Sequence, residues 1–244
     1  VFMIASSLIV GALLAMGLTI PQVFGLTALA NLAVALYIFL LVPEYLLRFI
    51  AFIASRLIYR FKVRGDEHIP IEGPAIIACN HVSFVDAVLL MAASPRPIRF
   101  VMDHRIFRVP VLGWMFKLAK AIPVAPQKKD PAAYAAAFEA ADKVLAEGDL
   151  LGIFPEGAIT RDGALQPFKG GIMKILERRP VPVVPVALQN LWGSYFSRVE
   201  GSAMAKPFRR GLFSPVGLVA GSALPALSVS PDVLRAQVSA LLEA

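Results

Sequence analysis

The chain has 244 residues, of which 57% are hydrophobic and only 17% are charged, and its mean hydropathy is +0.69. A soluble domain carries about a quarter charged residues, so this composition excludes a disordered chain and argues against a purely soluble protein. The net charge of +7 suits a nucleic acid or an anionic membrane surface, and the apolar start of the chain favours the membrane.

Residues 1–43 contain no Asp, Glu, Lys or Arg. Residues 2–20 are long enough, as a helix, to cross the roughly 30 Å hydrocarbon core of a bilayer. A Pro-Gln pair interrupts the apolar run, and residues 23–42 form a second one. We therefore predict two transmembrane helices, preferred over a signal peptide because the start carries no charge and a second span follows. The five positive charges from Arg48 to Arg64 place the following domain in the cytoplasm.

Residues 44–60 combine apolar side chains with arginines that share one helical face. Arg48, Arg56 and Arg60 are spaced by eight and four residues, close to whole helical turns. This pattern predicts an amphipathic helix in the membrane interface, with its arginines toward lipid phosphates. The alternative is an ordinary amphipathic helix packed on the domain.

From residue 61 onward, short apolar runs alternate with helical patterns. The candidate strands are residues 61–63, 75–79, 98–102, 122–125, 150–154, 181–188 and 216–220. The candidate helices are residues 84–93, 110–120, 131–147, 170–178 and 231–243. This alternation predicts one α/β domain over residues 61–244, a length that suffices for a single core.

A first polar segment, Asn-His-Val-Ser-Phe-Val-Asp at residues 80–86, directly follows a candidate strand, where α/β proteins hold their ligands. His81 and Asp86 have the chemistry of a general base and its orienting carboxylate. Positions five apart lie about 140° apart on a continuous helix, so this pair has to span a loop-to-helix turn in order to meet. Alternatively, Ser83 and Asp86 form a capping box for the next helix.

A second polar segment follows the candidate strand at 150–154. Glu156 lies in a Pro-Glu-Gly turn, with Arg161 and Lys169 nearby in the sequence. The pair Gly170-Gly171 opens a helix whose first amides could receive an anion. This segment suits a phosphate group; the alternative is a solvated turn with ordinary surface charges.

Several other kinds of site are excluded by the sequence. It contains no Gly-x-Ser-x-Gly, Walker A or Gly-x-Gly-x-x-Gly pattern, which argues against an α/β-hydrolase, a nucleotide hydrolase and a dinucleotide cofactor. Cys79 is the single cysteine, so an intramolecular disulfide is impossible and a thiolate-rich zinc site is not expected. The sequence contains no basic patch interleaved with aromatic residues, which is the pattern that would indicate nucleic-acid binding. We expect neither a metal nor a nucleic-acid partner.

The two polar segments together resemble the glycerophospholipid acyltransferase superfamily. Its Asn-His-x-Ser-x-x-Asp motif matches residues 80–86, its Phe-Pro-Glu-Gly motif matches residues 154–157, and the resemblance covers about residues 58–222. It implies an α/β domain whose mixed sheet is flanked by helices. It also implies transfer of an acyl group from acyl-ACP or acyl-CoA to the free hydroxyl of a lysophospholipid, without a cofactor.

The resemblance also implies the roles of single residues. His81 and Asp86 would be catalytic, with His81 as the general base. The implied substrate-binding residues are Asn80, Ser83, Glu156, Gly157, Thr160, Arg161, Lys169 and Gly170. Among them, Asn80 and Ser83 would shape the turn, Glu156 would contact a glycerol hydroxyl, and the cations would bind the phosphate. The implied partners are the lysophospholipid, the acyl thioester, membrane lipids and acyl carrier protein.

One branch of the superfamily is favoured by finer detail. Residues 57–66, 80–86 and 195–201 resemble the acyltransferase part of the bacterial bifunctional 2-acylglycerophosphoethanolamine acyltransferase/acyl-carrier-protein synthetase. In some bacteria that family is fused behind a lysophospholipid transporter. The two predicted spans and the start at Val1 are what the end of such a transporter would look like. We therefore expect the chain to be a piece of a fusion protein in the inner membrane. Its catalytic domain is expected on the cytoplasmic side.

Two positions depart from the pattern of lysophosphatidate acyltransferases, which carry arginines where this chain has Ile159 and Pro126. Fewer cations suit a phosphodiester better than a phosphate monoester. Lysophosphatidylethanolamine is therefore the expected acceptor, and lysophosphatidate is the alternative. A non-catalytic lipid-binding domain on a transporter is a further alternative, but it would have no use for the pair of His81 and Asp86.

Overall fold

The computed structural model describes residues 2–110, 112–194, 196–199 and 213–244. The chain divides into two compact units. The first unit ends at Pro43 and the second is Glu44–Ala244. Of the segment 195–201 noted above, residues 195, 200 and 201 lie outside the described residues.

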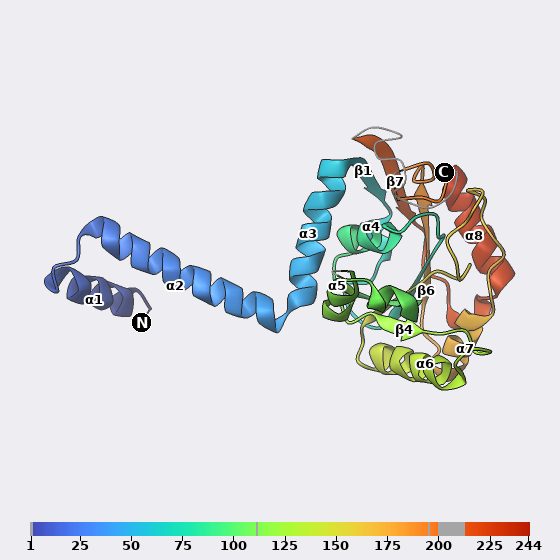
Figure 1. Cartoon of the computed structure of the whole chain (residues 1–244), viewed down its shortest axis with the longest axis horizontal. Helices are drawn as coiled ribbons and strands as arrows, with labels where there is room; N and C mark the ends of the chain where they lie inside the picture. The colour runs from blue at the N-terminus through green and yellow to red at the C-terminus, as the bar shows by residue number, and fades with distance from the viewer. Residues whose placement is uncertain (1, 111, 195, 200–212) are drawn as a thin grey trace. The chain divides into compact units, whose positions relative to one another are not determined.

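The first unit contains the helices α1 (Phe2–Ala15) and α2 (Ile20–Leu41) (Figure 1). Among the described residues, α2 is the one helix long and apolar enough to cross a membrane. Pro21 does not break this helix, because it lies in the first turn, where its missing N–H is not needed. The predicted first span over residues 2–20 is not confirmed: α1 has 14 residues, and Gly17 with a φ of 90° follows its end.

The second unit contains a sheet with the strand order β1-β7-β6-β2-β5-β3-β4. Its strands are β1 (Tyr59–Arg64), β2 (Ala75–Cys79), β3 (Ile98–Asp103), β4 (Ile122–Val124), β5 (Leu150–Ile153), β6 (Val183–Gln189) and β7 (Ser214–Ala220). The strands β6, β2, β5, β3 and β4 are parallel to one another, whereas β7 is antiparallel to β6. The sheet is therefore mixed, as predicted, and every candidate strand is present.

Helices cover both faces of this sheet. They are α3 (Pro43–Ile58), α4 (Asp86–Ala93), α5 (Leu112–Leu118), α6 (Pro131–Ala146), α7 (Gly171–Arg178) and α8 (Pro231–Glu243). Among the described residues, short 3-10 helices lie at Asp66–His68, His104–Arg108 and Ala226–Ser228. Each candidate helix of the α/β domain is present, with ends that differ by a few residues from the sequence pattern.

Alternate residues of the central strand β2 face two separate apolar clusters, as the pleat of a strand requires. Ile77 belongs to a cluster that includes residues of α3 and α4, such as Leu90. Ile76 belongs to a cluster that includes residues of α6, α7 and α8, such as Leu145. All five residues of β2 are buried, which explains why this strand reads as a continuous apolar run.

The helix α3 is attached to the α/β domain by charged side chains. Glu44 Oε1 lies 3.2 Å from Arg99 Nη2 and 2.9 Å from Lys120 Nζ. Arg48 Nε donates a hydrogen bond to the backbone oxygen of Ser94 at 2.6 Å. Arg48 therefore points into the domain, toward Ser94, and not toward lipid as predicted. For this residue the alternative of a helix packed on the domain is correct.

The exposed side of α3 carries an apolar stripe made of Tyr45, Phe49, Ile53 and Leu57. These four residues are spaced by one helical turn and are between 41% and 63% exposed. Arg56 is also exposed, and its guanidinium carbon lies 3.5 Å from the centroid of the Phe52 ring. The exposed side of the helix is therefore mainly apolar, and Arg56 is the predicted arginine that remains exposed on it.

We predict that Arg99→Ala destabilises the second unit by about 1.5–3 kcal/mol, because it removes a charged hydrogen bond to the buried carboxylate of Glu44, which keeps Lys120 as its other partner. Arg105→Ala is the matched control, since Arg105 forms an exposed pair with Asp103 whose loss costs at most about 1 kcal/mol. Chemical unfolding in detergent measures both variants. Equal losses would contradict a structural role for the buried pair.

Candidate functional site

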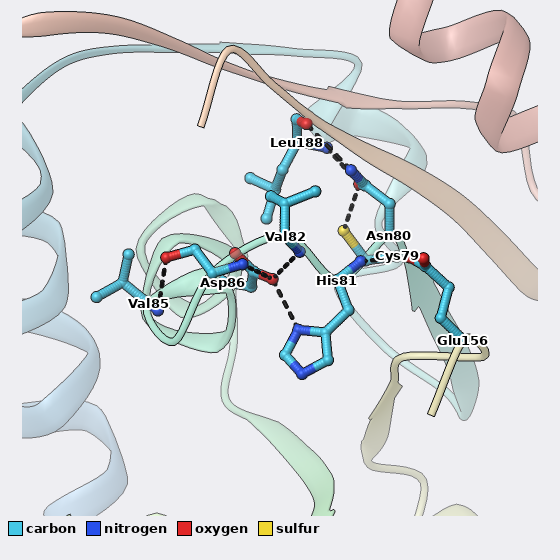
Figure 2. A network of polar contacts seen from close by, with 9 residues as sticks. Cys79, Asn80, His81, Val82, Val85, Asp86, Glu156 and Leu188 are labelled. Carbon is cyan, nitrogen blue, oxygen red and sulfur yellow. Dashed lines mark hydrogen bonds and ion pairs between the residues drawn. The ribbon is translucent and has the colours of Figure 1, made fainter. Parts of the chain in front are cut away.

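Two side chains that follow β2 meet at the carboxyl edge of the sheet. His81 Nδ1 lies 2.8 Å from Asp86 Oδ2 (Figure 2). The chain turns between these residues, and α4 begins at Asp86, so the pair spans a loop-to-helix junction as its spacing requires. Asp86 is fully buried, whereas the side chain of His81 is 21% exposed. The imidazole is therefore held by a buried carboxylate and remains accessible.

The Asp86 carboxylate also holds the backbone of the turn. Its Oδ2 accepts hydrogen bonds from Val82 N at 2.8 Å and Ser83 N at 3.0 Å. The bond to Ser83 N is the carboxylate half of the predicted capping box, whereas the N-cap residue of α4 is Val85 and has no side-chain cap hydrogen bond. Burial raises the pKa of Asp86, and the hydrogen bonds from His81 and the two amides oppose this rise.

The loop after β5 holds the backbone of His81 from both sides. His81 N donates to Glu156 Oε1 at 2.6 Å, and Thr160 N donates to the backbone oxygen of His81 at 2.9 Å. The second oxygen of Glu156 accepts from Gln166 N at 2.8 Å. The ring of Phe154 stacks on the imidazole, with 4.2 Å between the centroids. The two predicted polar segments thus form one structure.

This geometry gives Glu156 two backbone partners. The residue is 4% exposed, and each carboxylate oxygen accepts one amide. Burial raises the pKa of Glu156, while the hydrogen bonds from Gln166 and His81 lower it. These contacts position the His81 backbone, and the contact of Glu156 with a glycerol hydroxyl stays a prediction.

Asn80 and Ser83 are buried and support the turn. The side chain of Asn80 accepts from Leu188 N at 2.8 Å and donates to the backbone oxygen of Leu188 at 3.2 Å (Figure 2). It thereby extends the pairing of β2 with β6 beyond the end of the strand. Ser83 forms an isolated β-bridge with Ser197, and its hydroxyl accepts from Val85 N at 3.3 Å.

The remaining predicted binding residues lie between β5 and α7. Gly157 has a φ of 71°, and a Cβ there would lie 2.6 Å from Lys169 Nζ, so the ammonium group lies against this turn. Arg161 is exposed, whereas Thr160 is 2% exposed and bonds within its own loop. Gly170 is the N-cap residue of α7. Lys169 is thus the cation that the structure brings next to the Pro-Glu-Gly turn.

Arg198 is a cation at the site to which the sequence analysis assigned no role. Its guanidinium carbon lies 5.4 Å from the centroid of the Phe84 ring. The bridge between Ser83 and Ser197 holds it beside the turn that carries His81. The sequence offers no signal for this placement, because the two segments are distant in the chain and an arginine is common on any surface.

Cys79 has no reactive character in this setting. It is fully buried, its Sγ lies 3.4 Å from Asn80 Oδ1, and burial raises the pKa of the thiol well above its ordinary value. Within the described ranges, no group of three or more His, Cys, Asp or Glu side chains is arranged to hold a metal. The expectation of no metal and no cofactor stays a prediction.

Comparisons with known proteins follow the same segments of the chain. The family model described as Acyltransferase matches residues 60–189. The chain is 30% identical over 133 residues to the chloroplastic 1-acyl-sn-glycerol-3-phosphate acyltransferase BAT2 of Brassica napus, covering 54% of this chain and 38% of that protein. It is 30% identical over 130 residues to the 1-acyl-sn-glycerol-3-phosphate acyltransferase of Bacillus subtilis (strain 168), covering 53% and 62%. The chain thus spans less than two thirds of the length of these relatives.

A solved structure shares the fold. The 1-acyl-sn-glycerophosphate (LPA) acyltransferase PlsC from Thermotoga maritima superposes with a TM-score of 0.62 at 22% sequence identity. The superposition covers 82% of this chain and 78% of that chain. This likeness confirms the predicted α/β fold with a mixed sheet flanked by helices.

The raised pKa of Glu156 leads to a prediction about stability. Folding raises the pKa of this carboxyl group, so the folded state holds its proton more tightly than the unfolded state does. The resulting contribution to the free energy of unfolding is complete at pH values below the unfolded pKa. It is lost as the pH rises through the folded pKa. Glu156→Gln removes this titration. The free energy of unfolding of the wild type, minus that of Glu156→Gln, should therefore fall as the pH rises above the ordinary value of 4.5. A difference that grows over this range would show that the amides outweigh burial.

Proposed function

Because the chain belongs to the acyltransferase family, we propose that it is an O-acyltransferase that moves a fatty acyl group from a thioester to the free hydroxyl of a lysophospholipid. The observation that carries this proposal is the contact between His81 and Asp86. With Nδ1–H donated to the buried carboxylate, the lone pair of His81 Nε2 is free to accept a proton. That arrangement is what activation of a hydroxyl group requires.

The proposed reaction is a direct transfer. His81 Nε2 takes the proton of the acceptor hydroxyl while its oxygen attacks the thioester carbonyl carbon. The new C–O bond forms, the C–S bond breaks, and the departing thiolate receives the proton from His81. Asp86 stabilises the imidazolium that exists between these two proton transfers. General-base catalysis of this kind contributes on the order of 10²–10⁴ in rate.

The proposed first acceptor is lysophosphatidate, which reverses the order given by the sequence. The curated relatives are named for 1-acyl-sn-glycerol-3-phosphate. Lysophosphatidylethanolamine is the second candidate. Its support is that the buried, uncharged Ile159 occupies the position where lysophosphatidate acyltransferases typically carry an arginine. Both acyl-ACP and acyl-CoA present a thioester on a phosphopantetheine arm, and both remain candidate donors.

The proposed location is the cytoplasmic face of the inner membrane, where a lysophospholipid resides. The length and composition of α2 and the apolar stripe of α3 support attachment to a bilayer. The proposed fusion behind a lysophospholipid transporter, with residues 1–43 as its last part, rests on the resemblance described above.

The decisive experiment measures thioester consumption by detergent-solubilised protein. It crosses acyl-ACP and acyl-CoA with lysophosphatidate, lysophosphatidylethanolamine and lysophosphatidylglycerol. We expect transfer to lysophosphatidate that falls by on the order of 10²–10⁴ in His81→Ala. His68→Ala is the control, because His68 binds the backbone oxygen of Ala220 on β7. Preference for the ethanolamine lipid would establish the second candidate, and no product from a folded preparation would refute the proposal.

Lys169→Ala tests the proposed contact with the phosphate. Loss of one charge-assisted hydrogen bond should raise the KM for the lysophospholipid about tenfold to hundredfold, with a smaller effect on kcat. Lys174→Ala is the matched control, because Lys174 is exposed on α7 and lies beside Tyr134. A fall in kcat at unchanged KM would argue that Lys169 does not bind the ground-state substrate.

A further inference from the structure

The segment that follows β6 lies against the turn that follows β2. Ser197 forms an isolated β-bridge with Ser83, and Phe84 N donates a hydrogen bond to the backbone oxygen of Phe196 at 3.2 Å. Ser197 is buried, and its hydroxyl donates a hydrogen bond within its own segment. The backbone next to Arg198 is therefore fixed beside the turn that carries the proposed general base.

The same segment also contacts the loop after β5. A Cβ on Gly163, whose φ is 84°, would lie 2.6 Å from Cδ1 of Trp192, so the indole occupies the space that the side chain of any other residue would need. In the sheet, β2 lies between β5 and β6. The turn after β2 thus contacts the segments after both neighbouring strands, and these two segments contact each other.

Arg198 brings a positive charge to this place. Its side chain is exposed, and its guanidinium carbon lies 5.4 Å from the centroid of the Phe84 ring, within the range of a cation–π interaction. Contact with a ring leaves the N–H groups at the edge of a guanidinium available, and arginine can bind two phosphate oxygens through them at once. The Phe84 ring therefore holds the cation beside the turn without using its hydrogen-bond donors.

The proposed site has a use for this cation. Two positions where lysophosphatidate acyltransferases carry arginines are uncharged in this chain, at Ile159 and Pro126. Lys169 lies next to the Pro-Glu-Gly turn and supplies one positive charge there. A phosphate monoester carries a charge of about −1.5 to −2 at neutral pH, so a second cation at this edge of the sheet would balance it. Arg198 comes from the segment that can supply that charge.

We propose that Arg198 binds a phosphate group of a substrate. The segment after β6 is then a third part of the binding site, beside the turn after β2 and the loop after β5. Two sources can supply this phosphate, which are the headgroup of the lysophospholipid and the phosphopantetheine arm of the acyl donor. This inference rests on the proposed function, and it gives a substrate-binding role to a segment outside the two polar motifs.

The test uses pairs of ligands that differ by a phosphate group. The first pair is a short-chain lysophosphatidate and the monoacylglycerol with the same acyl chain, and the second pair is phosphopantetheine and pantetheine. Binding to the full chain in detergent is measured by titration calorimetry. In Arg198→Ala, we expect the affinity for one of the two phosphate ligands to fall about tenfold to hundredfold, the usual cost of one charge-assisted hydrogen bond. The affinity for the ligands without phosphate should not change.

Two further variants serve as controls. Arg178→Ala removes an exposed arginine at the end of α7 and should leave all affinities unchanged. Arg198→Lys should recover part of the lost affinity, because it keeps the positive charge but not the paired donors. Loss for lysophosphatidate would identify the headgroup as the source of the phosphate, and loss for phosphopantetheine would identify the donor. Unchanged affinity of Arg198→Ala for both phosphate ligands, or equal losses within a pair, would overturn the inference.

A double-mutant cycle tests the contact between Arg198 and Phe84. Phe84→Leu should weaken binding of the same phosphate ligand about twofold to fivefold in the wild type, which is the usual size of an exposed cation–π interaction. In an Arg198→Ala background, Phe84→Leu should change the affinity by a factor near one. The same loss in both backgrounds would contradict the placement of the guanidinium on which the inference depends.

Kinetic measurements separate this inference from the proposed function. Arg198→Ala should raise the KM for the substrate whose phosphate it binds about tenfold to hundredfold, with a smaller effect on kcat. Binding of a phosphate ligand that depends on Arg198, in a protein that transfers no acyl group, would refute the proposed function and keep this inference. Acyl transfer with wild-type KM values for both substrates in Arg198→Ala would refute this inference alone.

Discussion

The backbone of His81 is fixed by hydrogen bonds on both sides, and the rest of the site is arranged around that constraint. Beyond the end of β2 this residue has no neighbour in the sheet, so its buried amide and carbonyl need other partners. Glu156 and Thr160, from the loop after β5, supply them. With the backbone held, the imidazole reaches Asp86 at the start of α4.

The sheet explains why these partners are available. β2 lies between β5 and β6, and all three strands are parallel, so the segments that follow them emerge at the same edge. Each of the two neighbouring strands, β5 and β6, leads to one contact that holds the turn after β2. The loop after β5 holds the backbone of His81, and Leu188 on β6 pairs with the side chain of Asn80. The turn that carries His81 is thus held by long-range contacts with neighbouring strands.

Much of this architecture could be predicted from the sequence, because buried parallel strands are apolar runs and the pair of His81 and Asp86 follows one of them. The limits have physical causes. The end of α1 depends on Gly17, which adopts a left-handed conformation that an apolar pattern does not reveal. The direction of Arg48 depends on a carbonyl group far along the chain. The backbone partners of Glu156 likewise depend on contacts between separate segments of the chain.

The central claim, that Asp86 fixes the protonated nitrogen of His81, is tested most directly by ¹⁵N NMR of histidine-labelled protein. The His81 signals are identified by their loss in His81→Ala. In the neutral ring, we predict a protonated Nδ1 and an unprotonated Nε2, and this preference should disappear in Asp86→Asn. A proton on Nε2 in the wild type would leave no lone pair for the acceptor hydroxyl, and the account would be wrong.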